Sequence, residues 1–175
     1  DYFQNQLLSE LDYENEAQKQ MQIYQHFKND QILIPRVYEE YSNNLILVQE
    51  FRKGMHLNEL KLSPYEVRFQ VARQMTHFLL NSIFQLGLVH GDFQPQNWAY
   101  DIEAQKLIVY DFGSMIQLTK KQQEGLIRLL LSQNDLDTLM GYAQLGFSEK
   151  NLSVITDRIH HLTQEIIKPF HSKNW

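Results

Sequence analysis

One stretch of the sequence, LVHGDFQPQNWAYDIEAQKLIVYDFG at residues 88–113, constrains the fold more than any other. It opens with a polar bend in which Asp92 and Asn97 stand five positions apart. Two apolar runs follow, separated by a short polar turn, and the second run ends at Asp111, the first residue of Asp-Phe-Gly. This pattern predicts a small β-hairpin, NWAY paired with KLIVYDF, that carries the bend at one end.

The order of side chains in this stretch matches what phosphoryl transfer requires. The reaction needs Mg²⁺ near the phosphates and a carboxylate directed at the attacking hydroxyl group. In the pattern H-x-D-x-x-x-x-N followed by D-F-G, Asp92 would accept or orient the hydroxyl proton, while Asn97 and Asp111 would bind Mg²⁺ through oxygen. Gly113 would leave the backbone free to turn after the metal ligand. The pattern therefore predicts ATP and Mg²⁺ as cofactors.

Each of these residues also has a purely structural interpretation. Asp92 and Asn97 are common turn formers, Asp111 can end a strand, and His90 can be a satisfied buried histidine. For any one residue alone, the structural interpretation is the better one. The whole set arises by chance in roughly one chain of this length in ten thousand at average residue usage. For the set, we therefore favour a nucleotide-handling fold.

Composition and charge exclude several other classes of protein. The 175 residues, 43% of them apolar, suffice for a compact domain with a core. A net charge of −5 argues against nucleic acid as a partner. Because cysteine is absent, neither a disulfide framework nor a thiolate metal site is expected, which fits a reducing compartment such as the cytoplasm. No apolar run reaches 18 residues, so no transmembrane segment is expected.

The first half of the chain predicts a helix, two strands and a second helix. Apolar residues spaced three and four apart predict a helix over about residues 6–28. QILIPRVYEEYS and NLILVQEF predict two strands joined by a turn at residues 42–44, with Pro35 placing the first strand at an edge. The clearest helix begins after Ser63, where Glu66 would complete a capping box, and ends at Gly87. Its inward stripe comprises Val67, Val71, Met75, Phe78, Leu79, Ser82 and Ile83.

The second half is predicted to be helical beyond Gly113. Thr119 with Gln122 forms a capping-box pattern at the start of one helix, and a further helix is expected from Ser148 onward. Helices and strands do not alternate as they do in βαβ units. The order of elements therefore predicts an α+β fold.

Several segments resemble the UbiB/AarF (ADCK-type) atypical kinase family, which has the protein-kinase-like superfold. SELDYENEAQKQ, at residues 9–20, resembles the signature helix of that family, which opens with E-x-D-[YF]-x-x-E-A. IPRVYEEYSNNLILVQEFRKGMHLNEL resembles its strands leading into the hinge. LTKKQQEGLIRLLLSQNDLDTLMGYAQLGF is similar to the segment that follows its Asp-Phe-Gly. The resemblance extends from about residue 8 to residue 147.

The resemblance implies roles for particular residues. Glu16 would be the helix carboxylate that pairs with the ATP-binding lysine, Asp92 the catalytic aspartate, and Asn97 and Asp111 the metal ligands. The hinge, whose backbone groups meet adenine, would comprise Gln49, Glu50 and Phe51. By itself, Glu16 has the simpler interpretation of an exposed helix residue.

The resemblance also implies an architecture and a cellular role. Residues 1–50 would form a partial N-terminal lobe with the signature helix and a hairpin. Residues 51–175 would form a helical C-terminal lobe with the catalytic loop and Asp-Phe-Gly. An atypical kinase or ATPase of this family would use Mg–ATP and act in isoprenoid quinone (ubiquinone) biosynthesis, with a lipid or quinone-pathway partner. We expect a cytoplasmic protein, with association at the membrane periphery.

The sequence departs from the family pattern in two respects. The family usually reads H-A-D-x-H-P-G-N, and here Gly91, Gln94 and Gln96 replace its Ala, His and Gly. Many kinases have a lysine where Gln94 stands, so charge stabilisation is reduced. Before Glu16 there is no phosphate-covering loop, strand lysine or K-x-G-Q segment. We therefore expect an N-terminally truncated chain that is inactive by itself, in which Glu16 has no partner and ATP binds weakly.

Two alternatives remain open at this point. HGDFQPQN followed by DFG is also similar to small-molecule phosphotransferases of the aminoglycoside and choline kinase type. A non-catalytic pseudokinase or scaffold is the other alternative, favoured by Gln94 and by the missing N-terminal segments.

Overall fold

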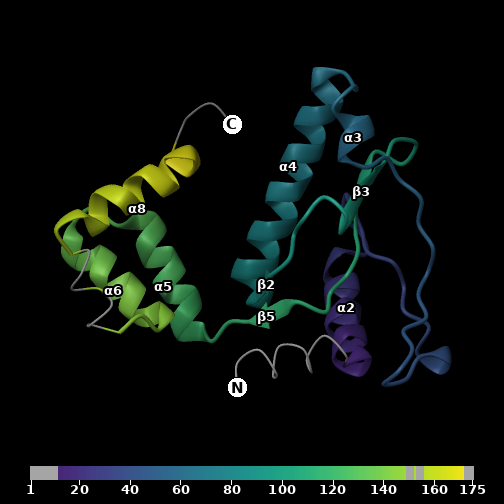
Figure 1. Ribbon diagram of the computed structural model, residues 1–175, viewed down its shortest axis with the longest axis horizontal. Helices are drawn as coiled ribbons and strands as arrows, with labels where there is room; N and C mark the ends of the chain where they lie inside the picture. The colour runs from purple at the N-terminus through teal and green to yellow at the C-terminus, as the bar shows by residue number, and fades with distance from the viewer. Residues whose placement is uncertain (1–11, 149–151, 153–155, 172–175) are drawn as a thin grey trace. The chain divides into compact units, whose positions relative to one another are not determined.

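The computed structural model describes residues 12–148, 152 and 156–171, and these fall into two compact units. The first unit comprises residues 1–117 and the second residues 118–175 (Figure 1). The mixture of helices with two small sheets agrees with the predicted α+β class. The predicted lobe boundary at residue 50 stays a prediction.

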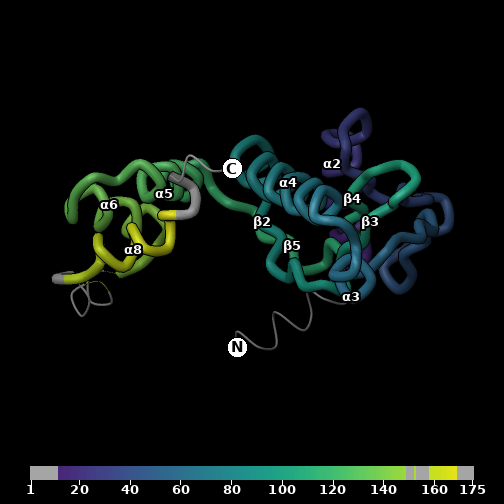
Figure 2. Tube along the Cα trace, turned by 90° about the horizontal axis from the view of Figure 1, so that it is seen from above, coloured from purple at the N-terminus to yellow at the C-terminus, as the bar shows by residue number. Residues whose placement is uncertain are grey.

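The first unit contains a three-stranded sheet, a two-stranded sheet and two long helices. Helix α4 runs beside the strands in both Figure 1 and Figure 2. The three-stranded sheet has the order β1-β4-β3, with β1 parallel and β3 antiparallel to β4, and β2 pairs with β5 in the other sheet. The elements are α2 (Tyr13–Phe27), β1 (Ile32–Leu33), η1 (Glu39–Tyr41), α3 (Leu57–Leu60), α4 (Tyr65–Asn81), η2 (Ser82–Leu86), β2 (Leu88–His90), β3 (Trp98–Asp101), β4 (Lys106–Val109) and β5 (Met115–Gln117).

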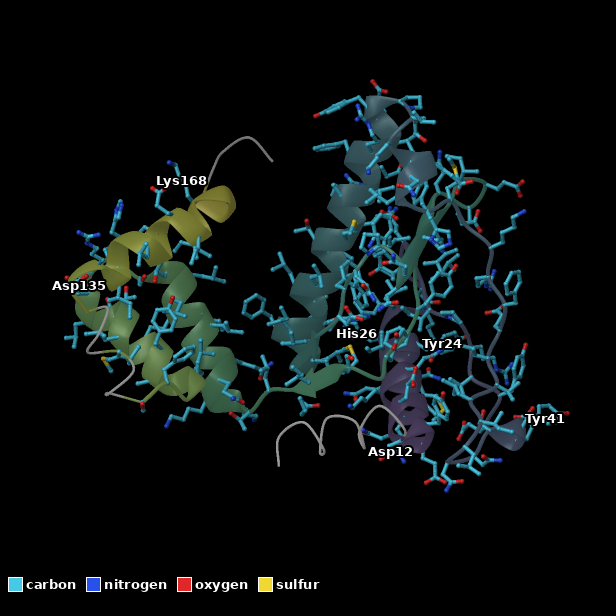
Figure 3. The ribbon with its side chains drawn as sticks, in the orientation of Figure 1. Asp12, Tyr24, His26, Tyr41, Asp135 and Lys168 are labelled. Carbon is cyan, nitrogen blue, oxygen red and sulfur yellow. The ribbon has the colours of Figure 1, made fainter. Side chains whose placement is uncertain are left out.

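Helix α2 begins where Asp12 caps it, since the Asp12 carboxylate accepts a hydrogen bond from the Asn15 amide (Figure 3). The expected start of this helix near residue 6 lies outside the described residues. The apolar face of α2 packs into the core of the unit, which also takes side chains from α4 and the strands. Completely buried members of this core include Ile23, Phe78, Leu107 and Phe112.

The predicted pairing of QILIPRVYEEYS with NLILVQEF is confirmed only in part. The Tyr38 amide donates to the Val48 carbonyl at 2.9 Å and the Asn43 amide to the Ile46 carbonyl at 2.8 Å, so the segments run antiparallel around the predicted turn without forming regular strands. Only Ile32–Leu33 forms a strand, and it pairs in parallel with β4 instead. The two segments meet through an isolated bridge between Val37 and Gln49. Pro35 has no amide hydrogen to donate, and the short helix η1 follows soon after it, so a regular ladder is interrupted on this side.

Helix α4 ends as predicted but starts differently. Gly87 closes the helix in the left-handed conformation, with φ 69°, after a π-helical turn. The expected capping box of Ser63 and Glu66 is absent: Pro64 occupies the cap position and makes no side-chain cap hydrogen bond. The Ser63 amide instead donates to the Leu60 carbonyl and belongs to the turn after α3. The buried face includes Gln74, which the predicted apolar stripe left out.

The predicted hairpin NWAY–KLIVYDF is confirmed as β3 and β4. Trp98 pairs with Val109, and Asp101 pairs with Lys106 across the turn. Strand β5 was not expected. It pairs with β2, with His90 opposite Met115, and so holds the two ends of the polar stretch together.

The described residues of the second unit form the helices α5 (Lys120–Leu131), α6 (Asp135–Leu145) and α8 (Thr156–His171). The Thr119–Gln122 capping box at α5 is confirmed. Helix α6 was not expected as a separate element, and Asn134 caps it. The expected helix from Ser148 onward corresponds to α8, although residues 149–151 and 153–155 lie outside the described part. Within the described residues, no helix is long and apolar enough to cross a membrane.

Candidate active site

The polar bend holds its own aspartate in place. The side-chain nitrogen of Asn97 donates to the Asp92 carbonyl oxygen at 2.8 Å and to Asp92 Oδ2 at 3.1 Å. Gln94 Nε2 donates to the same Oδ2 at 3.0 Å. Asn97 is buried, and its Oδ1 accepts no hydrogen bond from any described residue. The loop therefore fixes the Asp92 carboxylate by one oxygen and leaves Oδ1 of both residues as acceptors.

His90 packs against the bend from the interior of the unit. It is 6% exposed, and its ring packs edge-on against Phe93, with centroids 5.2 Å apart, and near Phe112 at 5.9 Å. Its Nε2 faces the Tyr110 carbonyl at 3.4 Å. Burial lowers the pKa of His90, although the Tyr110 carbonyl and the Asp111 carboxylate oppose this shift. A neutral histidine therefore packs between the bend and the Asp-Phe-Gly segment at pH 7.

The hairpin brings Asn97 and Asp111 to the same end of the sheet. The Tyr110 amide donates to the Asn97 carbonyl at 2.8 Å, so Asp111 follows directly after the residue paired with Asn97. Asp111 adopts a positive φ of 54°, which is uncommon for a residue with a side chain. Its Oδ1 accepts a hydrogen bond from the Gly113 amide at 3.2 Å.

Gly113 does not serve the predicted purpose. Asp111, not Gly113, takes the left-handed conformation in this turn. A Cβ added at Gly113 would lie 3.4 Å from Glu16 Oε2 and 3.5 Å from Asp111 Oδ1. Both distances are ordinary van der Waals contacts, so a Cβ would fit beside the two carboxylates, and the expected freedom to turn after the metal ligand is not what Gly113 provides.

Helix α2 binds the Asp-Phe-Gly segment directly. Glu16 Oε1 accepts a hydrogen bond from the Phe112 amide at 3.3 Å, and Lys19 Nζ donates to the Met115 carbonyl at 2.8 Å. Burial raises the pKa of Glu16. The Phe112 amide lowers it, the Asp111 carboxylate raises it further, and Lys19 lowers it. The expectation that Glu16 has no partner is wrong, because the backbone of this segment is its partner.

The predicted hinge borders a cavity of about 370 Å³. Gln49, Glu50, Phe51 and Tyr110 all line it, so the hinge and the residue before Asp111 face one space. The Tyr110 hydroxyl donates to the Arg52 carbonyl at 2.8 Å and joins the two sides. The Glu50 amide is already used, since it donates to a carbonyl of the preceding segment at 2.7 Å.

Comparison with known proteins identifies the family. Residues 1–141 match the family model described as the ABC1 atypical kinase-like domain. The chain belongs to this family. It is 29% identical over 147 residues to Protein ACTIVITY OF BC1 COMPLEX KINASE 8, chloroplastic, of Arabidopsis thaliana, an alignment covering 80% of this chain and 19% of that protein. It is 24% identical over 165 residues to Atypical kinase COQ8B, mitochondrial, of Rattus norvegicus, covering 87% of this chain and 31% of that protein.

A solved structure shows the same fold. The complex of Rv3197 with erythromycin from Mycobacterium tuberculosis matches with a TM-score of 0.67 at 20% identity, covering 94% of this chain and 43% of that one. This ABC1-family chain therefore has a kinase-like fold. It spans less than a third of the length of the two relatives named above.

The side chains of Asn97 and Asp111, at the end of the hairpin, carry the types of oxygen ligand that Mg²⁺ prefers. No group of three or more His, Cys, Asp or Glu residues able to hold a metal occurs in the described part of this ABC1-family chain. Asn97 and Asp111 together offer an amide oxygen and a carboxylate, which are hard ligands. Mg²⁺ in nucleotide sites commonly takes one or two protein ligands and completes its shell with phosphate oxygens and water. Two protein ligands are therefore enough for such a site.

Residues outside the motifs also shape the site. Lys19 and Gln20 on α2 were not predicted to have a role. Gln20 is completely buried, and its Nε2 donates to Gln49 Oε1 at 2.6 Å and to the Pro35 carbonyl at 2.7 Å. It thereby ties α2 to the hinge. One signal was present in the sequence, because Gln20 stands at a helical spacing between Ala17 and Ile23, among apolar positions.

Proposed function

We propose that this ABC1-family chain carries the Mg–ATP site of an atypical kinase or ATPase. The proposal rests mainly on one observation: the β3–β4 hairpin brings Asn97 beside Asp111, while the amide nitrogen of the same Asn97 fixes Asp92. Metal-binding oxygens and a carboxylate for the attacking hydroxyl thus share one short stretch of backbone. Transfer of a phosphoryl group depends on such placement more than on covalent chemistry by the protein.

In this proposal each residue has a distinct task. Asn97 and Asp111 would hold Mg²⁺, which neutralises charge on the phosphate oxygens when it is bound. Asp92 has one oxygen fixed by its loop, and the other would accept or orient the proton of the attacking hydroxyl. Glu16 keeps the backbone of Phe112 in position, and so fixes the direction of the Asp111 side chain.

The cavity at the hinge supports a place for the nucleotide base. Its lining by Gln49, Glu50 and Phe51 on one side and Tyr110 on the other puts it next to the proposed metal ligands along the chain. Phe51 is 87% exposed and offers a large apolar face to a planar ring. Because the Glu50 amide is already bonded, the backbone groups of Phe51 are the better candidates for contacts to adenine.

For the intact protein we propose a role linked to isoprenoid quinone biosynthesis, with a lipid or quinone-pathway partner at the membrane periphery. Support for this role comes from the resemblance of ELDYENEA and the catalytic loop to the UbiB/AarF family. The proposal of Mg–ATP binding does not depend on it.

A second candidate function is a non-catalytic, nucleotide-binding scaffold. The observation that favours it is the side chain of Gln94, which is neutral and hydrogen-bonds to Asp92 Oδ2. A lysine at this position would bring positive charge to the transferred phosphoryl group, and glutamine does not. Binding of Mg–ATP without turnover would identify this function.

Thermal unfolding of the intact protein with and without Mg–ATP tests the binding site. A ligand at about 100 times its dissociation constant stabilises the native state by about 2.7 kcal/mol, which gives a clear rise in Tm. We expect this rise in the wild type and in Asp135→Ala, a control at an exposed position of α6. We expect none in Asp111→Ala. An equal rise in Asp111→Ala, or none in the wild type, contradicts the proposed metal ligand.

Release of ADP separates an enzyme from a scaffold. Asp92→Asn removes the proton acceptor but keeps a side chain of the same size, so it should bind Mg–ATP and lose turnover. If the wild type binds Mg–ATP but releases no ADP, the scaffold is the correct function. A screen of aminoglycosides and amino alcohols in the same assay tests the small-molecule kinase alternative, which requires ADP release with one of these acceptors.

A further inference from the structure

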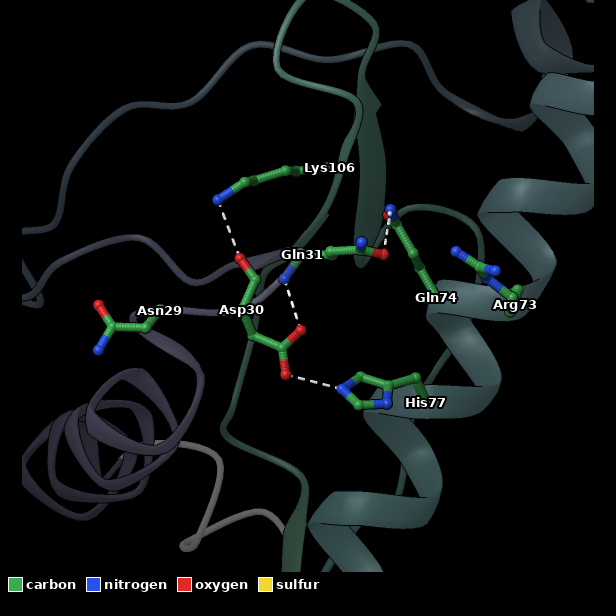
Figure 4. A pocket seen from close by; sticks show the side chains of 7 residues that line it. All are labelled: Asn29, Asp30, Gln31, Arg73, Gln74, His77 and Lys106. Atoms are coloured by element: carbon green, nitrogen blue, oxygen red, sulfur yellow. Dashed lines mark hydrogen bonds and ion pairs between the residues drawn. The ribbon is translucent and has the colours of Figure 1, made fainter.

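We propose that the first unit holds a second binding site, for a small organic molecule that carries two oxyanion groups. The site is a cavity of about 680 Å³ located where the parallel strands β1 and β4 begin (Figure 4). Residues 29–31, which connect α2 to β1, line one side. Arg73 and His77 from α4 and Lys106 from β4 line the rest.

Among the described residues that line the cavity, Asp30 is the only acidic one, and its carboxylate is already hydrogen-bonded by its neighbours. Asp30 Oδ2 binds His77 Nε2 at 2.7 Å, and Asp30 Oδ1 accepts from the Gln31 amide at 2.5 Å. Burial by itself would raise the pKa of Asp30, but the hydrogen bonds from His77 and from the Gln31 amide lower it overall. The carboxylate therefore stays ionised and turned toward His77 (Figure 4).

A series of side-chain contacts orients His77 toward Asp30. Asn81 Nδ2 lies 3.1 Å from His77 Nδ1 and donates to the His77 carbonyl at 2.9 Å. Gln85 Nε2 donates to Asn81 Oδ1 at 2.6 Å, which directs the Asn81 nitrogen toward the histidine. His77 thus accepts at Nδ1 and donates from Nε2 to Asp30, so the Asp30 carboxylate is turned toward His77 and makes no ion pair with Arg73 or Lys106 among the described residues.

Two permanent cations remain in the cavity. Lys106 Nζ makes one hydrogen bond, to the main-chain carbonyl of Asp30 at 2.9 Å, so it has two further N–H groups. Arg73 is exposed and has no ion pair or hydrogen bond to any other described residue. Arg73 and Lys106 carry two positive charges against the one negative charge of Asp30, and this excess in a chain with a net charge of −5 favours an anionic ligand.

The arrangement of these cations indicates the class of ligand. A guanidinium group binds carboxylate or phosphate through two parallel hydrogen bonds, and an ammonium group binds either as a point charge. In Figure 4, Arg73 and Lys106 enter the cavity from different sides of residues 30 and 31. One inorganic phosphate would leave most of the volume empty. A molecule with an oxyanion group at each end engages both cations and the neutral amide of Asn29.

This site is separate from the proposed nucleotide site. The cavity at the hinge and this one share no lining residue. Lys106 is the first residue of β4, and Tyr110, which lines the hinge cavity, follows its last. Four residues of extended chain separate the two by about 13 Å. The proposal of a second site therefore does not depend on the proposal of Mg–ATP binding.

Isothermal titration of the chain with succinate and, separately, with pyrophosphate tests the proposal and distinguishes carboxylate from phosphate ligands. Metal ions are removed beforehand on a chelating resin, so that without a metal ion the carboxylates of Asp92 and Asp111 repel both probes. We expect saturable binding of at least one probe, weakened by added salt. Loss of one charge-assisted contact in Arg73→Gln or Lys106→Gln should weaken binding roughly tenfold.

Matched variants separate a binding effect from a folding effect. Arg68→Gln removes an exposed arginine five residues earlier, about 140° around the same helix, and should bind as the wild type does. Lys106→Arg keeps the charge and should restore most of the affinity. The proposal is overturned if neither probe saturates or if Arg73→Gln and Lys106→Gln bind normally. Binding that survives both substitutions but changes in Asp111→Ala places the anion at the candidate active site and also overturns it.

Discussion

Replacing Gln74 with methionine tests how α4 holds β4, the strand that leads to Asp111. Gln74 is 2% exposed, and its Oε1 accepts a hydrogen bond from the Leu107 amide at 2.7 Å. Its Nε2 donates to the Gln105 carbonyl at 2.9 Å. Gln105 has a positive φ of 55°, so this hydrogen bond also stabilises an uncommon backbone conformation. Methionine has nearly the same length and volume but can form neither bond.

The expected loss of stability follows from the burial of the two partners. Leu107 is completely buried, so its amide loses its partner without access to water, which costs about 1–3 kcal/mol. Gln105 is exposed, and its carbonyl can bind water, so only the net value of that hydrogen bond is lost, about 0.5–1.5 kcal/mol. Because methionine fills the space of glutamine, no cavity term is added. The free energy of unfolding should therefore fall by about 2–4 kcal/mol.

Urea unfolding followed by tryptophan fluorescence measures this loss. The chain has two tryptophans, so a Trp175→Phe background leaves Trp98, which lies on β3 beside β4, as the only indole. Gln70→Met is the matched control, because Gln70 Nε2 donates to the same Gln105 carbonyl through a long, exposed hydrogen bond of 3.4 Å. It should change stability by less than about 0.5 kcal/mol. If Gln74→Met is equally mild and the Leu107 amide still exchanges slowly with solvent, the reasoning is refuted.

Two further predictions concern the candidate active site. Gly91→Ala, which introduces the residue usual in the family, should lower the free energy of unfolding by about 1–3 kcal/mol in the same urea assay. The reason is that a Cβ at Gly91 would lie 2.5 Å from the Ser114 carbonyl oxygen. An unchanged free energy of unfolding would show that the loop accommodates the methyl group without strain. As the pH rises from 4.5 to 7, the free energy of unfolding of Glu16→Gln should increase relative to that of the wild type. The folded state holds the proton of Glu16 above the ordinary pKa of 4.5, so the wild type loses stability across this range and the glutamine variant does not. Parallel stability curves would contradict the raised pKa.

Elements fixed by neighbouring residues were predictable from the sequence. The β3–β4 hairpin follows from alternating apolar residues around a polar turn, and Gly87 ends α4 because it accepts a positive φ. The pairing of Ile32 with Leu107 was not predictable in this way, since the two residues are far apart along the chain and the nearer segment, NLILVQEF, has equally good strand character. The error in the first hairpin therefore concerns the regular strand, which Ile32 and Leu33 form with β4, while the segments around the predicted turn meet only through isolated bridges.

In the candidate site, too, local contacts were predictable from the sequence and long-range contacts were not. The spacing of Asp92 and Asn97 is local, and the structure joins them by hydrogen bonds, as a bend of this length allows. The contacts that α2 makes are not local: Lys19 reaches the carbonyl of Met115, 96 positions away. A sequence pattern gives no distance between such residues unless the fold is already known. The roles of Asn97 and Asp111 as metal ligands stay a prediction until binding is measured.

The two contacts from α2 change the interpretation of Glu16. Glu16 and Lys19 are three residues apart, on one face of the helix, and they bind a backbone N–H and a backbone carbonyl that flank the turn after Asp111. A shift of α2 away from this turn must break both hydrogen bonds together. The position of Asp111 is therefore coupled to that of α2 within this chain, through Phe112 and Met115, without any lysine from another segment.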